Sequence, residues 1–111
     1  MSLRYHDPSL SQDEAISFIA TNDLTKVTEA LISIGLNETD AIWAQETCLK
    51  YANNDNEDIA SAAIIAIGHI ARRFGELDMA KVTPVLQQAK RKSPSLSGVV
   101  QDTLDDIQMF T

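Results

Sequence analysis

The segment 53–58, Asn-Asn-Asp-Asn-Glu-Asp, has the oxygen-rich composition of a calcium-binding loop. An EF-hand loop needs glycine at its sixth position, where the chain turns sharply, and a carboxylate at its twelfth. Counted from Asn53, those positions hold Asp58 and Ile64, so the motif fails. A turn followed by a helix cap accounts for the segment without an ion, because short polar side chains bind nearby backbone groups.

The other residues with catalytic chemistry have no suitable neighbours. Asp102, Asp105 and Asp106 form one acidic side of an expected helix, whereas the paired carboxylates of a glycosidase face each other across a cleft. Cys48 has only Lys50 beside it, which points elsewhere, and a buried cysteine behaves as a small hydrophobic residue. We therefore predict no catalytic residue and no enzyme activity.

A metal site is not expected either. The two histidines, His6 and His69, and the single cysteine are too few for an ordinary structural zinc site. No Asp, Glu, His or Cys lies three or four residues from His69 along its helix, so we expect this histidine to lie at a packed edge. No phosphate-binding loop or serine elbow is present. The sequence predicts no metal and no cofactor.

Trp43 is the residue that core packing explains least well. On a helical wheel, the apolar side of its helix consists of Ala41, Ile42, Cys48, Leu49 and Ala52. Trp43 lies far from the centre of that cluster, beside Glu46, and Tyr51 lies at its edge. Tryptophan and tyrosine are typical anchors of protein interfaces. Trp43 therefore either contacts a partner or packs on a neighbouring helix pair or on the N-terminal arm.

The charge distribution indicates what kind of partner this would be. The chain has 111 residues and a net charge of −7, and residues 1–58 contain eleven acidic residues against three basic ones. Net negative charge repels phosphate backbones, so we expect no nucleic-acid binding. An acidic surface steers a basic protein partner. The alternative is that the acidity only keeps a small domain soluble.

No apolar run approaches the roughly 20 residues that span a bilayer, and the N-terminus lacks the apolar centre of a signal peptide. We therefore expect a cytoplasmic protein that does not bind a membrane. The chain length fits one domain covering residues 1–111.

The apolar residues recur with a helical period almost throughout, which predicts an all-α fold. Ser11 and Glu14 form a capping box at the first helix. Gly35 is expected to end the second helix and Gly75 the fourth. Pro84 predicts either a helix start near Thr83 or a bend there. The later five helices are expected at 22/23–35, 37–52, 55/56–75, 78–92 and 96–110.

Three apolar positions recur at intervals of about 36 residues in three of these helices. The aligned sets are Val27, Ala63 and Val100; Leu31, Ile67 and Leu104; and Ile34, Ile70 and Ile107. Such a period in a helical chain predicts stacked helix pairs, because each pair needs a neighbour to cover its apolar face. The alternative is that any three amphipathic helices of equal length align in this way.

The segment 58–68 resembles the core helix of a HEAT repeat. The matching positions are Ile59, Ala63, Ala66, Ile67 and Gly68, whereas Ala60 stands where the family often has arginine. The resemblance covers about residues 40–110. It implies a short right-handed α-solenoid of about three HEAT-like helix pairs that serves as a binding scaffold.

A short, acidic, all-helical chain of this kind is also similar to bacterial immunity proteins of contact-dependent growth-inhibition systems. That resemblance implies a non-enzymatic protein that binds and neutralises a basic toxin domain. The alternative function is a structural or adaptor subunit that homo-oligomerises, and the oligomeric state stays open. The expected partner-binding residues are Trp43, Glu46, Tyr51, Asp55, Glu57 and Asp58.

Overall fold

The computed structural model describes residues 9–111, and that part of the chain contains six α-helices, one short 3-10 helix and no strand. This confirms the all-helical prediction. The elements are α1 (Gln12–Ala20), α2 (Leu24–Asn37), α3 (Ala41–Tyr51), α4 (Glu57–Phe74), α5 (Met79–Lys92), η1 (Pro94–Leu96) and α6 (Ser97–Phe110).

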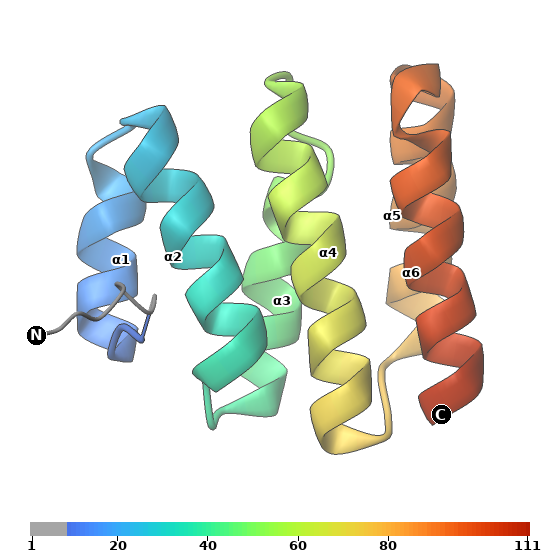
Figure 1. Ribbon diagram of the computed structural model, residues 1–111, viewed down its shortest axis with the longest axis horizontal. Coiled ribbons are helices and arrows are strands. Elements are labelled where there is room, and N and C mark those ends of the chain that lie inside the picture. The colour runs from blue at the N-terminus through green and yellow to red at the C-terminus, as the bar shows by residue number, and fades with distance from the viewer. Residues whose placement is uncertain (1–8) are drawn as a thin grey trace, which may run out of the picture.

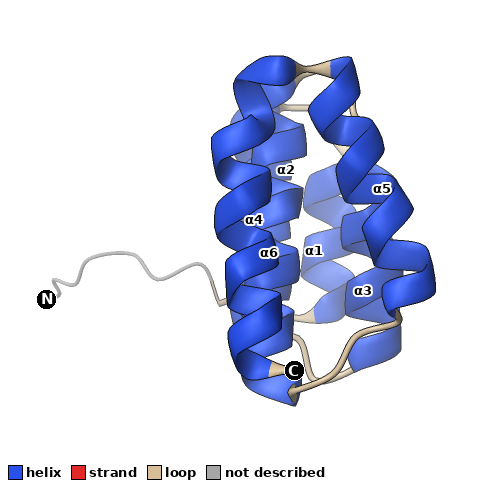
Figure 2. Cartoon of the chain, turned by 90° about the vertical axis from the view of Figure 1, so that its right-hand side faces the viewer, coloured by secondary structure: helices blue, strands red, loops and turns tan. Residues whose placement is uncertain are grey.

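Helix α4 occupies the centre of the molecule. It packs against α2 on one side, α6 on the other and α3 behind it. Figure 1 shows α2, α4 and α6 side by side, with α3 and α5 behind them, and α1 beside α2 at one end. Figure 2, turned by 90°, shows α3 and α5 on one side of the molecule and α4 and α6 on the other. The central helix is therefore covered on three sides, as its apolar sequence predicts.

Most helices begin where a short polar side chain caps them. Ser11 and Glu14 form the predicted capping box of α1, and each side chain accepts the other residue's backbone N–H. Asn56 caps α4, and its side-chain oxygen accepts the backbone N–H groups of Asp58 and Ile59. The acidic segment at 53–58 is thus a turn and helix cap. Gly75 ends α4 with φ of 72°, a left-handed conformation that favours glycine.

The recurring apolar positions all contribute to the core. Eight of the nine are buried, and Leu104 is half-buried against the same cluster. Two predicted helix boundaries were wrong. Gly35 does not end α2, which continues to Asn37; instead Gly35 lies where α2 crosses α4 at the backbone of Ala66. The third helix begins at Ala41 rather than at residue 37, because Glu38 and Asp40 form the turn before it.

Pro84 lies inside α5, which runs without interruption from Met79 to Lys92. The alternative start near Thr83 is therefore wrong. A proline at this position removes one backbone hydrogen bond. The helix follows directly from the linker after α4. A hydrogen bond from the backbone N–H of Asp78 to Gln45 of α3 fixes this linker.

Arg73 connects the C-terminal ends of two helices. Its guanidinium donates hydrogen bonds to the backbone carbonyls of Gly35, at 2.9 Å, and Glu38, at 2.5 Å. These carbonyls lie at the end of α2, where helix carbonyls lack partners within the helix. We expect Arg73→Ala to lower the free energy of unfolding by about 2 kcal/mol, because it removes hydrogen bonds from a charged donor. Urea denaturation followed by circular dichroism measures this.

Arg72 is the matched control for Arg73. Its side chain is half-exposed, and its ion pair with Asp106 spans 3.5 Å, so Arg72→Ala should cost less than about 1 kcal/mol. Equal losses in the two variants would contradict the role of Arg73 as a cap for α2.

Candidate functional site

A hollow of about 350 Å³ lies between the start of α3, the linker after α4 and the start of α5. Ile70 of α4 is buried and lines the hollow together with Leu77 of the linker. Ile42 of α3 lines the same hollow and is 73% exposed. We call this hollow the α3–α5 groove. It is large enough to accept a side chain or a small ligand.

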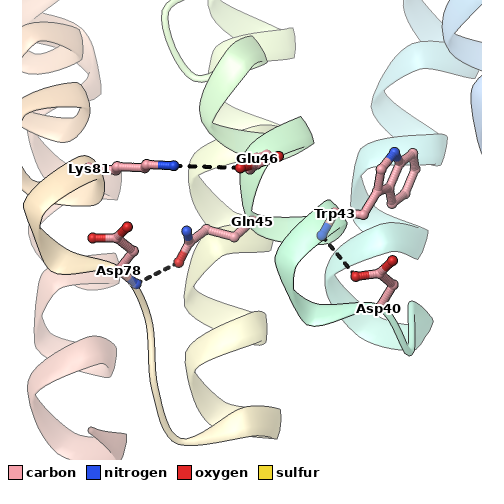
Figure 3. Close-up of polar contacts among 6 residues, drawn as sticks. All are labelled: Asp40, Trp43, Gln45, Glu46, Asp78 and Lys81. Carbon is pink, nitrogen blue, oxygen red and sulfur yellow. Dashed lines mark hydrogen bonds and ion pairs between the residues drawn. The ribbon is translucent and has the colours of Figure 1, made fainter.

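Two side-chain contacts link α3 to the linker and to α5 across the groove, as Figure 3 shows. Gln45 is buried, and its Oε1 accepts the backbone N–H of Asp78 at 2.7 Å. The Nζ of Lys81 lies 3.5 Å from a carboxylate oxygen of Glu46, and both side chains are more than half exposed. The hydrogen bond fixes the linker against α3, whereas the exposed ion pair contributes little to stability.

The rim of the groove is acidic. Three acidic residues, Glu46, Glu76 and Asp78, and one basic residue, Lys81, are among those that line it. Within residues 9–111, neither Glu76 nor Asp78 forms an ion pair. The side chain of Asp78 also makes no capping hydrogen bond at the start of α5. The groove therefore presents unneutralised carboxylates beside apolar surface.

The wheel prediction for α3 was correct for Cys48 and Ala52, which are buried, and wrong for Ile42. Ile42 was expected on the buried side, but its side chain is exposed, and Ala44 and Gln45 are buried instead. Trp43 is half-buried and packs against the core. In Figure 3 its side chain points away from Glu46, toward the ribbon of α2. A helical wheel based on hydrophobicity cannot predict a buried glutamine. The amide of Gln45 is buried because it binds the linker.

The other expected partner-binding residues lie near the opposite end of α3. Tyr51 is half-buried at the end of that helix, about 12 Å along the axis from Trp43 at 1.5 Å per residue. Asp55 lies 2.6 Å from the Nζ of Lys92, and this hydrogen bond and charge lower the pKa of Asp55. The structure therefore does not bring the six predicted residues together at one point.

Glu57 and Asp58 are the first two residues of α4 and follow Asp55 closely in the chain. Both are exposed, and Glu57 accepts a hydrogen bond from the hydroxyl of Ser95. Of the six residues, Glu46 alone lines the α3–α5 groove. The sequence analysis did not single out Gln45, Glu76, Asp78 or Lys81, which line the groove. The sequence signals only two of them, Glu76 and Asp78, as acidic residues that follow Gly75.

Cys48 is fully buried in α3, and burial raises the pKa of its thiol to about 12. The reactive species of a cysteine is the thiolate. We expect Ellman's reagent to modify the native protein at least about 100-fold more slowly than the protein in 6 M guanidinium chloride, because reaction must await opening of the fold. Rapid modification of the native protein, followed by absorbance, would contradict the buried position.

Residues with metal-binding chemistry are dispersed. No three His, Cys, Asp or Glu residues gather as a metal site within residues 9–111, and His6 lies outside the described residues. His69 is half-buried, and burial, with a smaller contribution from Arg72, lowers its pKa. None of the described helices is both long and apolar enough to cross a membrane.

No protein-family model matches the sequence, and no curated protein matches it. The crystal structure of a CDI complex from Cupriavidus taiwanensis LMG 19424 contains a chain that superposes with a TM-score of 0.82. The match covers 98% of this chain and 98% of that chain, at 26% sequence identity. The protein resembles a component of a CDI complex. This supports the resemblance to contact-dependent growth-inhibition systems.

Proposed function

We propose that this protein is a non-enzymatic immunity protein that binds a cognate toxin domain and neutralises it in the cytoplasm. The observation that carries the proposal is the full-length match to a chain of a CDI complex, at 26% identity. The acidic net charge supports a basic toxin domain as the partner.

The proposed architecture is a short right-handed stack of HEAT-like helix pairs. The buried recurring positions of α2, α4 and α6 support it, because these three helices also pack side by side. In such a stack each helix pair covers the apolar face of the next. The pairs then present an extended surface to a partner.

The experiment that tests the function is a protection assay in bacteria. We expect the open reading frame adjacent to this gene to encode the toxin domain, which is expressed from an inducible promoter with and without this protein. We expect growth arrest by the toxin alone, normal growth on co-expression, and co-elution of the two proteins in size-exclusion chromatography. A toxin domain from an unrelated system is the control and should still arrest growth.

Failure of the adjacent reading frame to encode a growth inhibitor would contradict the proposed function. So would arrest that persists in the presence of this protein.

Long-range steering by charge gives a second test of the partner. We expect replacement of Asp55, Glu57 and Asp58 by the corresponding amides to lower the association rate constant about threefold at low salt, and less as salt rises, because exposed charges are screened. Stopped-flow or biolayer interferometry measures the rate. The matched control removes three charges elsewhere, through Asp102→Asn, Asp105→Asn and Asp106→Asn. An association rate constant that does not change with salt would contradict a basic partner.

Trp43, Tyr51 and Glu46 remain proposed contacts of the same partner. Trp43 packs partly on the core, so its replacement would change stability as well as binding. For that reason the charge variants are the sharper test.

A further inference from the structure

The α3–α5 groove combines an apolar wall with a rim of carboxylates. We propose that it receives an arginine or lysine side chain of the toxin domain, and that this contact is a specific anchor of the complex. The proposal rests on the proposed function, and it names the contact that the function would use. It differs from general charge steering, because it depends on one place in the fold.

The chemistry of the groove matches the two parts of such a side chain. Arginine and lysine bury an aliphatic stem along apolar surface and keep the charged head at a polar rim. Ile42, Leu77 and Ile70 provide the apolar surface. Glu76 and Asp78 provide carboxylates that form no ion pair within residues 9–111. Carboxylates that bind a guanidinium or ammonium group form the stronger, charge-assisted hydrogen bonds.

Charge complementarity excludes an acidic occupant and favours a basic one. Three carboxylates surround the groove against one ammonium group, that of Lys81. Lys81 also shows the contact within the molecule itself, because its Nζ lies 3.5 Å from a carboxylate oxygen of Glu46. A cation of the partner would compete with Lys81 for these carboxylates. Lys81 should therefore weaken binding of the partner.

Ile42 is the second reason to expect an occupant. Its side chain is 73% exposed beside the groove, whereas other residues on the inner side of the same helix are buried. An apolar residue at the edge of a pocket that contains unpaired carboxylates is typical of an interface anchor surrounded by polar groups. The stem of the partner's basic residue would cover Ile42.

The test uses the adjacent-frame toxin domain, made inactive by substitution, and measures its dissociation constant at 150 mM salt by calorimetry. The double variant Glu76→Gln and Asp78→Asn should bind at least tenfold more weakly. Its matched control, Asp102→Asn with Asp105→Asn, removes the same charge from α6 and should change affinity less than twofold. Lys81→Met should bind about threefold more tightly.

The apolar contact has its own matched pair. Ile42→Ala should weaken binding at least fivefold, whereas Met109→Ala should leave it unchanged. Met109 is 74% exposed in α6, so both changes shorten equally exposed apolar side chains. Circular dichroism melts of all variants should coincide with that of the wild type, because none of these side chains is buried.

The outcomes separate this inference from the proposed function. A wild-type protein that does not bind the toxin domain would contradict the proposed function. Wild-type binding with unchanged affinity in the groove variants would overturn the groove alone. Equal losses in the two charge-neutralised doubles would also overturn it, because net charge and not the groove would then determine affinity.

Discussion

Ile67→Asp is expected to leave the protein unfolded at 25 °C. Ile67 is fully buried in α4, the helix that packs against α2, α3 and α6. The substitution removes a buried apolar side chain, which costs about 2–5 kcal/mol, and leaves an unpaired carboxylate in the core, which costs about 3–5 kcal/mol more. A domain of this size has about 5–15 kcal/mol of stability in total. We expect loss of the helical circular dichroism signal and of the cooperative thermal transition.

Ile65→Asp is the matched control on the same helix. Ile65 is 40% exposed, so its aspartate can reach water, and the variant should remain folded with a loss of about 1 kcal/mol. In the protection assay, the Ile67→Asp protein should fail to protect the cells. The Ile65→Asp protein should remain folded in the same cells. A soluble Ile67→Asp protein with the melting temperature of the wild type would contradict the central position of α4.

Gly35→Ala is expected to lower the free energy of unfolding by about 3 kcal/mol, the upper part of the range for an overpacked core. A Cβ at Gly35 would lie 2.7 Å from the Cα and 2.8 Å from the Cβ of Ala66. The first of these atoms belongs to the backbone of α4, so relief requires the two helices to move apart. Urea denaturation at 25 °C measures the loss, because its midpoint should fall without a change in slope.

The same substitution at Gly98, Gly98→Ala, is expected to have the opposite effect on stability or none. Gly98 is part of α6, and apart from its chain neighbours and the backbone of its own helix, no atom lies within 4 Å of a Cβ at this position. Alanine favours the helix over glycine by up to about 1 kcal/mol, so this variant should be as stable as the wild type or more stable. A stabilised Gly35→Ala protein would show that α2 and α4 cross elsewhere.

Local chemistry was enough to place the helices along the chain. Capping depends on side chains within three residues, so Ser11 could be predicted as an N-cap from the sequence alone. The start of α4 could be predicted only as Asp55 or Asn56, and the structure has Asn56 as the N-cap. The left-handed glycine at position 75 was predictable for the same reason. The spacing of Val27, Leu31 and Ile34 within one helix follows from the period of the helix itself. The acidic character of the first half is likewise a property of composition.

Contacts between distant segments decided the rest. Gly35 has the sequence signature of a helix end, yet its role is to let α4 approach, and the partner residue lies 31 positions away. Ile42 was expected on the apolar side of α3 but is exposed, whereas Gln45 is buried and binds the linker at Asp78. The α3–α5 groove exists only where that linker meets α3. The periodic spacing of apolar residues indicates which side of a single helix is apolar. Tertiary packing determines which side of that helix meets another helix, a linker or a partner.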